Sequence, residues 1–187
     1  MSLKVIGGRL KGRKLASPRG RTVRPTAGKV REAMFNIIGP AAKEAVALDL
    51  FAGAGALGIE ALSRGAARAV FIDNSREALS IIHRNIATCG LADQAVVLAR
   101  DATRDLGLPL AADLCADLVF LDPPYRAGLA GRALAALEKS SALSGETLVI
   151  VEHGIREPLE GLPGRFAVTD RRKYGDTLVS FLRYVIK

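Results

Sequence analysis

The residues of this chain with the clearest chemical potential are four in a row: Asp122, Pro123, Pro124 and Tyr125. They follow the apolar run at 117–121, which is typical of a buried strand. The chain must turn out of the sheet at Asp122, because proline lacks an N–H and has a fixed φ. The turn then offers a carboxylate, two carbonyl groups and an aromatic ring, which suits a planar substrate with an N–H donor, such as a nucleobase. The alternative is a proline-rich turn in which Tyr125 only covers the core.

A glycine-rich turn lies upstream, between a predicted strand and a predicted helix. Its spacing is Gly53-x-Gly55-x-x-Gly58, which lets the backbone turn sharply and lets a ligand approach it closely. Asp73 ends the next strand-like run, about 20 residues after the first glycine, where ribose hydroxyl groups are usually accepted. Together these features indicate a nucleoside-containing cofactor. The spacing fits NAD as well as S-adenosylmethionine, and a tight turn without a ligand is the remaining alternative.

Apolar runs and helical patterns alternate along the chain and give the elements that must position these groups. We predict strands near 46–50, 69–72, 95–99, 117–121, 147–152, 165–172 and 177–186, and helices near 56–64, 75–89 and 129–140. This alternation favours a parallel sheet with ligands at the carboxyl ends of its strands, and Gly175-Asp176 indicates a closing hairpin. Four acids lie at or beside such strand ends and should converge on one edge: Asp49, Asp73, Asp101 and Asp122.

The first 31 residues differ in charge from the rest of the chain. They contain ten of the 27 basic residues and no acid. The rest of the chain has 17 basic and 19 acidic residues, so the net charge of +8 comes from this segment. Such a cluster is typical of a polyanion partner whose phosphates give salt-sensitive affinity. Interleaved apolar residues favour an ordered extension over a solvated tail. We predict strands at 3–6 and 10–15, then a helix capped by Thr26 that runs to about Ile38.

Length and composition bound the class of protein. The chain has 187 residues, of which 49% are apolar and 25% charged, which predicts one globular domain with a substantial core. We find no apolar stretch of membrane-spanning length and no signal region, and we expect a cytoplasmic protein. We expect no metal site, reduced and partly buried thiols at Cys89 and Cys115, and ordinary polar roles for His83 on a helix and for His153 beyond a strand end.

The two central motifs resemble those of one class of enzymes. Asp49-x-Phe51-x-Gly53-x-Gly55, followed by Asp-Pro-Pro-Tyr, is similar to the amino-group methyltransferases that use S-adenosylmethionine and modify nucleobases. The N-terminal blocks at 5–15 and 24–36 resemble the RsmD family more narrowly, and so do the segments at 55–65 and 173–177. This resemblance covers nearly the whole chain.

The resemblance implies a Rossmann-like class I fold of the S-adenosylmethionine-dependent methyltransferases, with a mostly parallel sheet that ends in an antiparallel hairpin. Residues 1–40 would form a small basic N-terminal extension, and residues 41–187 would form the methyltransferase domain. The implied activity is methylation of the exocyclic N2 of a guanine in small-subunit (16S) ribosomal RNA. The substrate would be this RNA or the assembling 30S particle, and the enzyme would be a monomer without a metal or a membrane partner.

The resemblance also assigns roles to single residues. The catalytic turn would be Asp122, Pro123, Pro124 and Tyr125, where the carboxylate and the Pro123 carbonyl accept hydrogen bonds from the target amine and the tyrosine stacks on the base. The cofactor site would comprise Asp49, Phe51, Gly53, Gly55, Asp73, Asp101 and Thr26. Asp73 would accept the ribose hydroxyls, Asp101 the adenine amine, and Asp49 would anchor the loop or the methionine amino group. RNA would contact Arg9, Lys11, Arg13, Lys14, Arg24 and Arg31.

Three alternatives stay open. The same chemistry could act on DNA adenine or cytosine or on another RNA, because Asp-Pro-Pro-Tyr does not separate these substrates. The glycine spacing would also suit an NAD-dependent oxidoreductase, which leaves the basic segment and the double proline unexplained. A non-catalytic RNA-binding module leaves Asp-Pro-Pro-Tyr unexplained.

Overall fold

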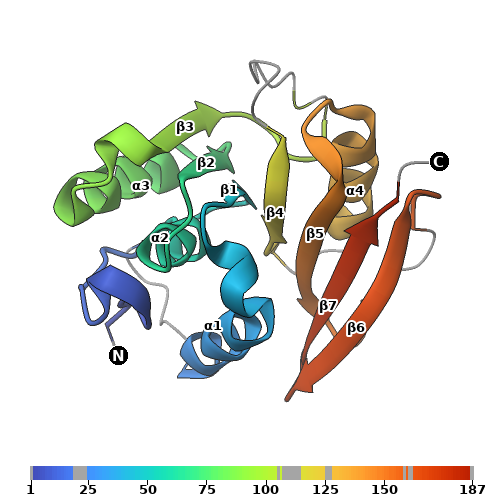
Figure 1. Ribbon diagram of the computed structural model, residues 1–187, viewed down its shortest axis with the longest axis horizontal. Coiled ribbons are helices and arrows are strands. Elements are labelled where there is room, and N and C mark those ends of the chain that lie inside the picture. Colours follow the sequence, from blue (N-terminus) through green and yellow to red (C-terminus); the bar gives the residue numbers. More distant parts are fainter. Residues whose placement is uncertain are drawn as a thin grey trace.

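A computed structural model describes residues 2–18, 25–104, 106, 115–124, 128–157, 159 and 162–185, without the side chains of residues 25–27. In these residues seven strands form one sheet in the order β3-β2-β1-β4-β5-β7-β6 (Figure 1). The strands are β1 Val46–Leu50, β2 Arg68–Asp73, β3 Ala95–Ala99, β4 Ala116–Leu121, β5 Leu143–Gly154, β6 Phe166–Tyr174 and β7 Thr177–Tyr184. Strands β1 to β5 are parallel, and β7 is antiparallel to both of its neighbours. The predicted mostly parallel sheet with a closing antiparallel hairpin is confirmed.

The helices follow the predicted pattern closely. They are α1 Pro25–Ile38, α2 Ala56–Ser63, α3 Arg76–Cys89 and α4 Leu129–Lys139, with the short 3-10 helices η1 Gly8–Leu10, η2 Gly39–Ala42 and η3 Ala92–Gln94. Helix α3 has a matching signal at each end, because the Ser75 hydroxyl accepts from the Ala78 amide and Gly90 adopts φ +66° after the last turn. Helix α1 begins at Pro25, so the prediction of Thr26 as its cap was wrong. Proline suits the first helical position because its missing N–H has no helical partner there.

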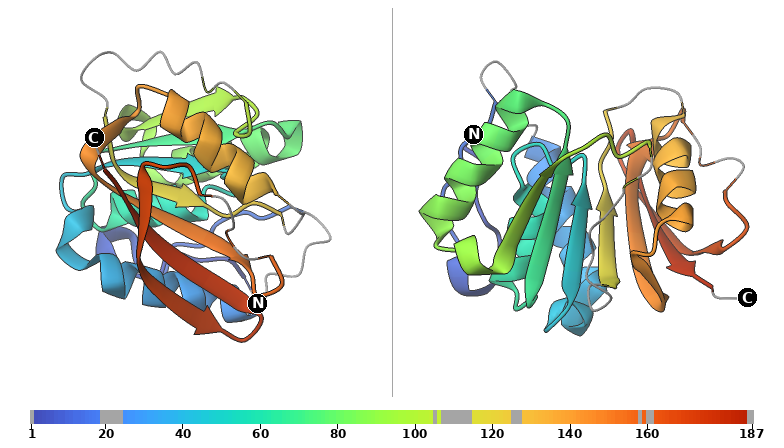
Figure 2. Two further views of the ribbon diagram at one scale, coloured as in Figure 1. Left: turned by 90° about the vertical axis from the view of Figure 1, so that its right-hand side faces the viewer. Right: turned by 90° about the horizontal axis from the view of Figure 1, so that it is seen from above.

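The two faces of the sheet carry separate hydrophobic clusters. Helix α4 packs on one face, and α1 and α2 pack on the other (Figure 2, left). The second face also receives α3 and the N-terminal segment, through residues such as Ile82 and Val5. Helix α1 contributes Val30, Met34, Phe35 and Ile38 to this same cluster. The N-terminal extension and the sheet therefore share one core.

Residues 2–18, here called the arm, run beside α2 as a narrow loop. The predicted strands at 3–6 and 10–15 are not formed: one antiparallel bridge joins Lys4 and Lys14, and η1 occupies the turn. The Val5, Gly12 and Leu15 amides pair the two segments by donating to the carbonyls of Arg13, Val5 and Leu3. Three other arm amides bond to α2: those of Ile6 and Gly7 donate to Glu60, and that of Leu10 donates to the hydroxyl of Ser63. The arm is therefore ordered, as predicted, both by its own pairing and by docking on a helix.

Several single-residue expectations are settled by burial. His153 lies within β5, only 2% exposed, and not beyond the strand end as predicted. Its Nε2 lies 2.9 Å from the Ser180 hydroxyl and its Nδ1 3.0 Å from the Glu157 carbonyl, so its polar role is satisfied inside the sheet. Burial lowers the pKa of His153. Cys89 is buried, whereas Cys115 is exposed and not partly buried.

Across the described part of the chain, no helix is long and apolar enough to cross a membrane. The same residues contain no group of three or more His, Cys, Asp or Glu side chains that could hold a metal ion.

Candidate active site

The two sequence motifs meet at the carboxyl ends of β1 and β4. These strands are parallel neighbours, and Leu50 pairs with Leu121 at their last shared position. The glycine loop, residues 51–55, and the turn Asp122-Pro123-Pro124 therefore start at the same level, one strand spacing of about 4.8 Å apart. The order β3-β2-β1-β4-β5 also reverses direction at this pair, and open α/β sheets bind ligands in the crevice at such a switch point.

The glycine loop combines one open position with two packed ones. Gly53 and Gly55 adopt φ +57° and +73°, and Phe51 adopts φ +61°, which is uncommon for a residue with a side chain. A Cβ on Gly55 would lie 3.2 Å from the Phe71 ring, and a Cβ on Gly58 would overlap it, so these glycines serve packing. A Cβ on Gly53 would meet only the Phe51 carbonyl oxygen, at 3.8 Å. The backbone at Gly53 is therefore open to close approach, which fits a cofactor lying against it.

Asp73 is fixed beside this loop at the end of β2. Its Oδ2 accepts from the Gly53 amide at 2.8 Å, and its Oδ1 accepts from the Ser75 amide at 2.8 Å. The Ala52 amide also donates to the Ile72 carbonyl, so the loop is held against the end of β2 by two bonds. Each carboxylate oxygen has a further lone pair, which leaves capacity to accept hydroxyl groups.

Asp49 is buried beneath the loop and is only 1% exposed. Its Oδ2 accepts from the Gly58 amide at 2.9 Å, which ties β1 to the first turn of α2. Burial raises the pKa of this carboxyl group to about 7; the Gly58 bond opposes the shift and the nearby Asp73 charge adds to it. Of the two roles considered for Asp49, this bond supports anchoring of the loop.

Asp101 follows β3 on the same edge of the sheet. It accepts from the Thr103 amide at 2.9 Å and from the Thr103 hydroxyl at 2.7 Å, and Arg104 Nε lies 3.3 Å from its second oxygen. The hydrogen bonds from Thr103 hold the pKa of this carboxyl below its usual range. Asp101 is therefore a charged acceptor, in keeping with its predicted contact with an amine.

The turn after β4 presents its groups differently. Asp122 and Pro124 are exposed, whereas Pro123 is buried. The buried proline fixes the direction in which the chain leaves the sheet, since its φ cannot change. Tyr125 and Arg24 lie outside the described residues, as does the side chain of Thr26.

The predicted RNA contacts divide into two groups. Four basic residues are exposed on the arm: Arg9, Lys11, Arg13 and Lys14. Arg31 is different, because it is 7% exposed, its Nη2 donates to the Lys4 carbonyl at 2.6 Å and its Nε lies 3.9 Å from Glu60 Oε2. Burial lowers the pKa of Arg31, and the Glu60 charge opposes that shift. The assignment of Arg31 to RNA is therefore corrected to a structural link between α1, the arm and α2.

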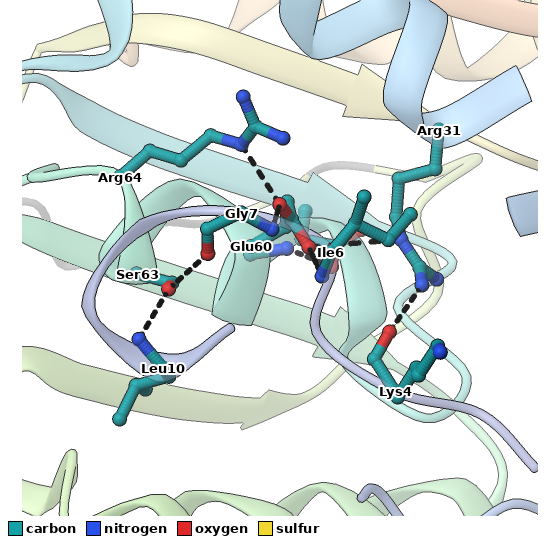
Figure 3. A network of polar contacts seen from close by, with 10 residues as sticks. Lys4, Ile6, Gly7, Leu10, Arg31, Glu60, Ser63 and Arg64 are labelled. Carbon is teal, nitrogen blue, oxygen red and sulfur yellow. Dashed lines mark hydrogen bonds and ion pairs between the residues drawn. The ribbon is translucent and has the colours of Figure 1, made fainter. Parts of the chain in front are cut away.

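Glu60 is the centre of a polar network that docks the arm (Figure 3). Its carboxylate, 1% exposed, accepts from the amides of Ile6 and Gly7 and from Arg64 Nε, each at 2.8 Å. Ser63, one turn further along α2, donates to the Gly7 carbonyl at 2.6 Å and accepts from the Leu10 amide at 2.9 Å. Both side chains belong to the helix that begins at the glycine loop, so the arm is attached to the same helix as the loop.

Asn85 is a second anchor that the sequence analysis missed. It lies on α3, is 1% exposed, and bonds to Ala16 of the arm and Ala54 of the glycine loop. Asn85 shares the inward face of α3 with Ile82 and Cys89, which is the one available signal that it is not a surface residue. Glu60 also lies among residues that are buried, because Gly58 to Ser63 of α2 are all buried.

Comparisons with known proteins agree with this architecture. The family "Conserved hypothetical protein 95" matches residues 3–183. Ribosomal RNA small subunit methyltransferase D of Escherichia coli is 37% identical over 168 residues, which cover 89% of this chain and 82% of that protein. The proposed rRNA methyltransferase YlbH of Bacillus subtilis is 35% identical over 181 residues, which cover 97% of this chain and 98% of that protein.

A solved structure extends the similarity to three dimensions. The Escherichia coli protein yhhF, a proposed methyltransferase, superimposes with a TM-score of 0.86 at 34% identity, over the whole of both chains. The family match, the level of identity and the shared fold all cover nearly the whole sequence. The chain therefore belongs to the RsmD family.

Proposed function

We propose that this protein transfers a methyl group from S-adenosylmethionine to the exocyclic N2 of a guanine in small-subunit ribosomal RNA. The observation that carries the proposal is the placement of the glycine loop and the Asp-Pro-Pro turn on adjacent strands, at the point where the sheet reverses. Relatives named as ribosomal RNA small subunit methyltransferase D support the reaction and the RNA class.

The composition of the turn selects the kind of group that can be methylated. Two prolines contribute carbonyl groups but no N–H, and an ionised carboxylate is an acceptor only. The exposed Asp122 and the backbone carbonyls after it therefore offer acceptors without donors. An exocyclic amine, which presents two N–H groups, is complementary to this turn, whereas a carbonyl oxygen of a base, which only accepts, is not.

The role of Asp122 follows from how an amine changes during methylation. The nitrogen lone pair is delocalised into the base, and it must leave the ring plane to react. Acceptors at Asp122 and at the Pro123 carbonyl would hold the two N–H groups out of that plane and would stabilise the positive charge that develops on nitrogen. The alkylated nitrogen is strongly acidic and loses its extra proton readily, so a strong base is not needed.

The residues around the glycine loop fit the proposed cofactor, which supplies an electrophilic methyl group when it is bound. Gly53 leaves the backbone open to the ligand. Asp73, which accepts a hydrogen bond from the Gly53 amide, would also accept the ribose hydroxyls. Asp101 would accept from the adenine amine. We propose that the loop and these acids orient the cofactor toward Asp122 across the β1–β4 boundary.

The exposed cations of the arm would hold the RNA. Arg9, Lys11, Arg13 and Lys14 lie on a segment that is bonded to α2 and α3, so they are presented on a fixed surface. Phosphate contacts of this kind position the RNA without reading its bases. The choice of the target amine would then rest on the turn after β4.

The test is methyl transfer from labelled S-adenosylmethionine to small ribosomal subunits prepared from cells that lack this protein, followed by nucleoside analysis. We expect label in N2-methylguanosine of the small-subunit RNA. Deproteinised RNA and duplex DNA serve as parallel substrates. Label on adenine or cytosine would replace the target base, and methylation of DNA alone would overturn the RNA assignment. Tight binding of NADH without binding of S-adenosylmethionine would overturn the reaction class.

A further inference from the structure

Asn85 is the only described side chain that bonds to both the arm and the glycine loop. Its Oδ1 accepts from the Ala16 amide at 2.7 Å, and its Nδ2 donates to the Ala16 carbonyl at 3.0 Å. The second hydrogen of Nδ2 goes to the Ala54 carbonyl at 2.9 Å. Both N–H groups of the side-chain amide and its oxygen therefore have partners, and the Asn85 side chain itself is buried.

The partner in the loop is well placed to control the cofactor site. Ala54 lies between Gly53 and Gly55, the two loop glycines with positive φ. The N–H of the peptide that joins Ala54 to Gly55 is held within the loop, because the Gly55 amide donates to the Ala52 carbonyl at 2.7 Å. The bond from Asn85 fixes the direction of the Ala54 carbonyl, and with it the orientation of the peptide that joins Ala54 to Gly55.

The partner in the arm lies near the end of its described part. The two bonds to Ala16 pair its peptide groups with the Asn85 amide, much as a neighbouring strand would. The described arm ends two residues later, at Pro18, and the chain continues to α1. One side chain thus bonds both to Ala16, near the end of the arm, and to Ala54, in the middle of the glycine loop.

We propose that Asn85 is a positioning residue that holds the glycine loop in its cofactor-binding conformation and locks the end of the arm to it. The proposal rests on the proposed function, because it takes the loop as the S-adenosylmethionine site. Asn85 touches no reacting atom; it acts through the Ala54 carbonyl. Its loss should weaken cofactor binding without slowing the reaction of the bound complex.

The principal variant is Asn85→Ala, and Ser63→Ala is its matched control. Ser63 also makes two bonds to the arm, but none to the glycine loop. Binding of S-adenosylmethionine is measured by calorimetry in the full-length protein. We expect the dissociation constant to rise about tenfold to a hundredfold in Asn85→Ala, since the Ala54 carbonyl loses its donor and the loop its restraint. In Ser63→Ala it should change by less than about threefold, because this site is separate from the loop.

Asn85→Asp has the same shape as the native side chain, so it also serves if the alanine variant does not fold. Its ionised carboxylate can still accept from the Ala16 amide, but it can donate neither to the Ala16 carbonyl nor to the Ala54 carbonyl. We expect it to lose cofactor affinity as Asn85→Ala does. For both variants, KM for S-adenosylmethionine should rise while kcat at saturation stays within about threefold of native.

A measurement without ligand tests the role of Asn85 in holding the loop independently of the proposed function. Amide hydrogen exchange in residues 50–58 should be faster in both Asn85 variants than in the native protein, and it should be unchanged in Ser63→Ala. Native exchange and native cofactor affinity in the Asn85 variants would overturn the inference, and so would an equal loss of affinity in Ser63→Ala. If the native protein itself fails to bind S-adenosylmethionine, the proposed function fails, while the exchange measurement still decides whether Asn85 holds the loop.

Discussion

The glycine loop and the Asp-Pro-Pro turn lie side by side, but their acidic groups differ in how far they are exposed to solvent. Around the loop, Asp49, Asp73 and Asn85 all bond to backbone groups of the protein itself. In the turn, Asp122 is exposed and the prolines bring no donors. The difference teaches that the two halves of the site answer different needs. A small cofactor can be bound by a loop that is already held in place by its neighbours. A base that belongs to a large RNA must instead reach acceptors that are exposed at the surface, such as Asp122.

The first prediction concerns Glu60 on α2, the helix that begins at the glycine loop and holds the arm. Replacement by Ala removes the acceptor of the Ile6 and Gly7 amides and leaves the buried Arg31 without its nearest acid. We expect the free energy of unfolding, measured by chemical denaturation, to fall by about 3–5 kcal/mol.

The control for this change is Glu146→Ala. The Glu146 side chain is 96% exposed and lies 4.0 Å from Arg183 Nη1. This exposed pair should contribute less than about 1 kcal/mol. Similar losses in the two variants would contradict a special role of Glu60 in docking the arm.

The exposed half can be broken at Asp122. Asp122→Asn keeps the shape of the turn but removes the charge that would stabilise the developing ammonium. We expect turnover to fall by about 10²- to 10³-fold, with stability and S-adenosylmethionine affinity nearly unchanged. The control is Asp117→Asn at the other end of β4, where the side chain only accepts from the Val46 amide. Loss of cofactor affinity equal to the loss of turnover would remove Asp122 from the chemical step.

The buried Asp49 beneath the glycine loop should make the stability of the protein depend on pH. Between the ordinary carboxyl pKa and about 7, the folded protein keeps a proton that the unfolded chain releases. Stability should therefore fall as pH rises through this window and level off above it. From pH 5 to pH 8 the fall should be about 2–3 kcal/mol.

Asp49→Asn tests this assignment because an amide does not titrate there. Denaturation of both proteins at pH 5 and pH 8 should show the fall in the native protein only. A fall of the same size in Asp49→Asn would assign the pH dependence to another group.

The smallest effect concerns the arm cations. Replacing Lys11, Arg13 and Lys14 by Gln should weaken binding of single-stranded ribosomal RNA about tenfold or more at moderate salt. It should also lower the slope of log K against log salt by about 2, at about 0.7 for each lost phosphate contact. Lys139→Gln on α4, which packs on the opposite face of the sheet, should leave that slope unchanged. An unaltered slope in the triple variant would show that the RNA lies elsewhere.

The sequence predicted those parts of the fold whose signals are local. The apolar run of β4, for example, is followed at once by Asp122 and two prolines, which mark the end of the strand. The placement of both motifs at one edge of the sheet followed from the general rule for alternating strands and helices. The pairing of β1 with β4, which makes the two motifs immediate neighbours, was not predicted.

The missed features depend on contacts between residues far apart in the chain. Arg31 reads as a surface cation, and only Glu60 and the Lys4 carbonyl explain why it is buried. The arm has strand-like composition, but the amides of Ile6, Gly7 and Leu10 bond to Glu60 and Ser63 of α2, more than 50 residues away in the chain. Asn85 is polar and lies on an amphipathic helix, so its two distant partners could not be read from its neighbours in the sequence.

The pairing of β1 has a consequence for how the chain is made. Ala47 pairs with Ala69 on one side and with Leu118 on the other. During synthesis β2 therefore reaches β1 early, while the other edge of β1 waits until β4 has emerged. An apolar strand with an open edge is a template for association with other chains. The strand that leads to Asp122 thus also covers the open edge of β1, and a chain that stops before residue 116 is expected to aggregate as well as to be inactive.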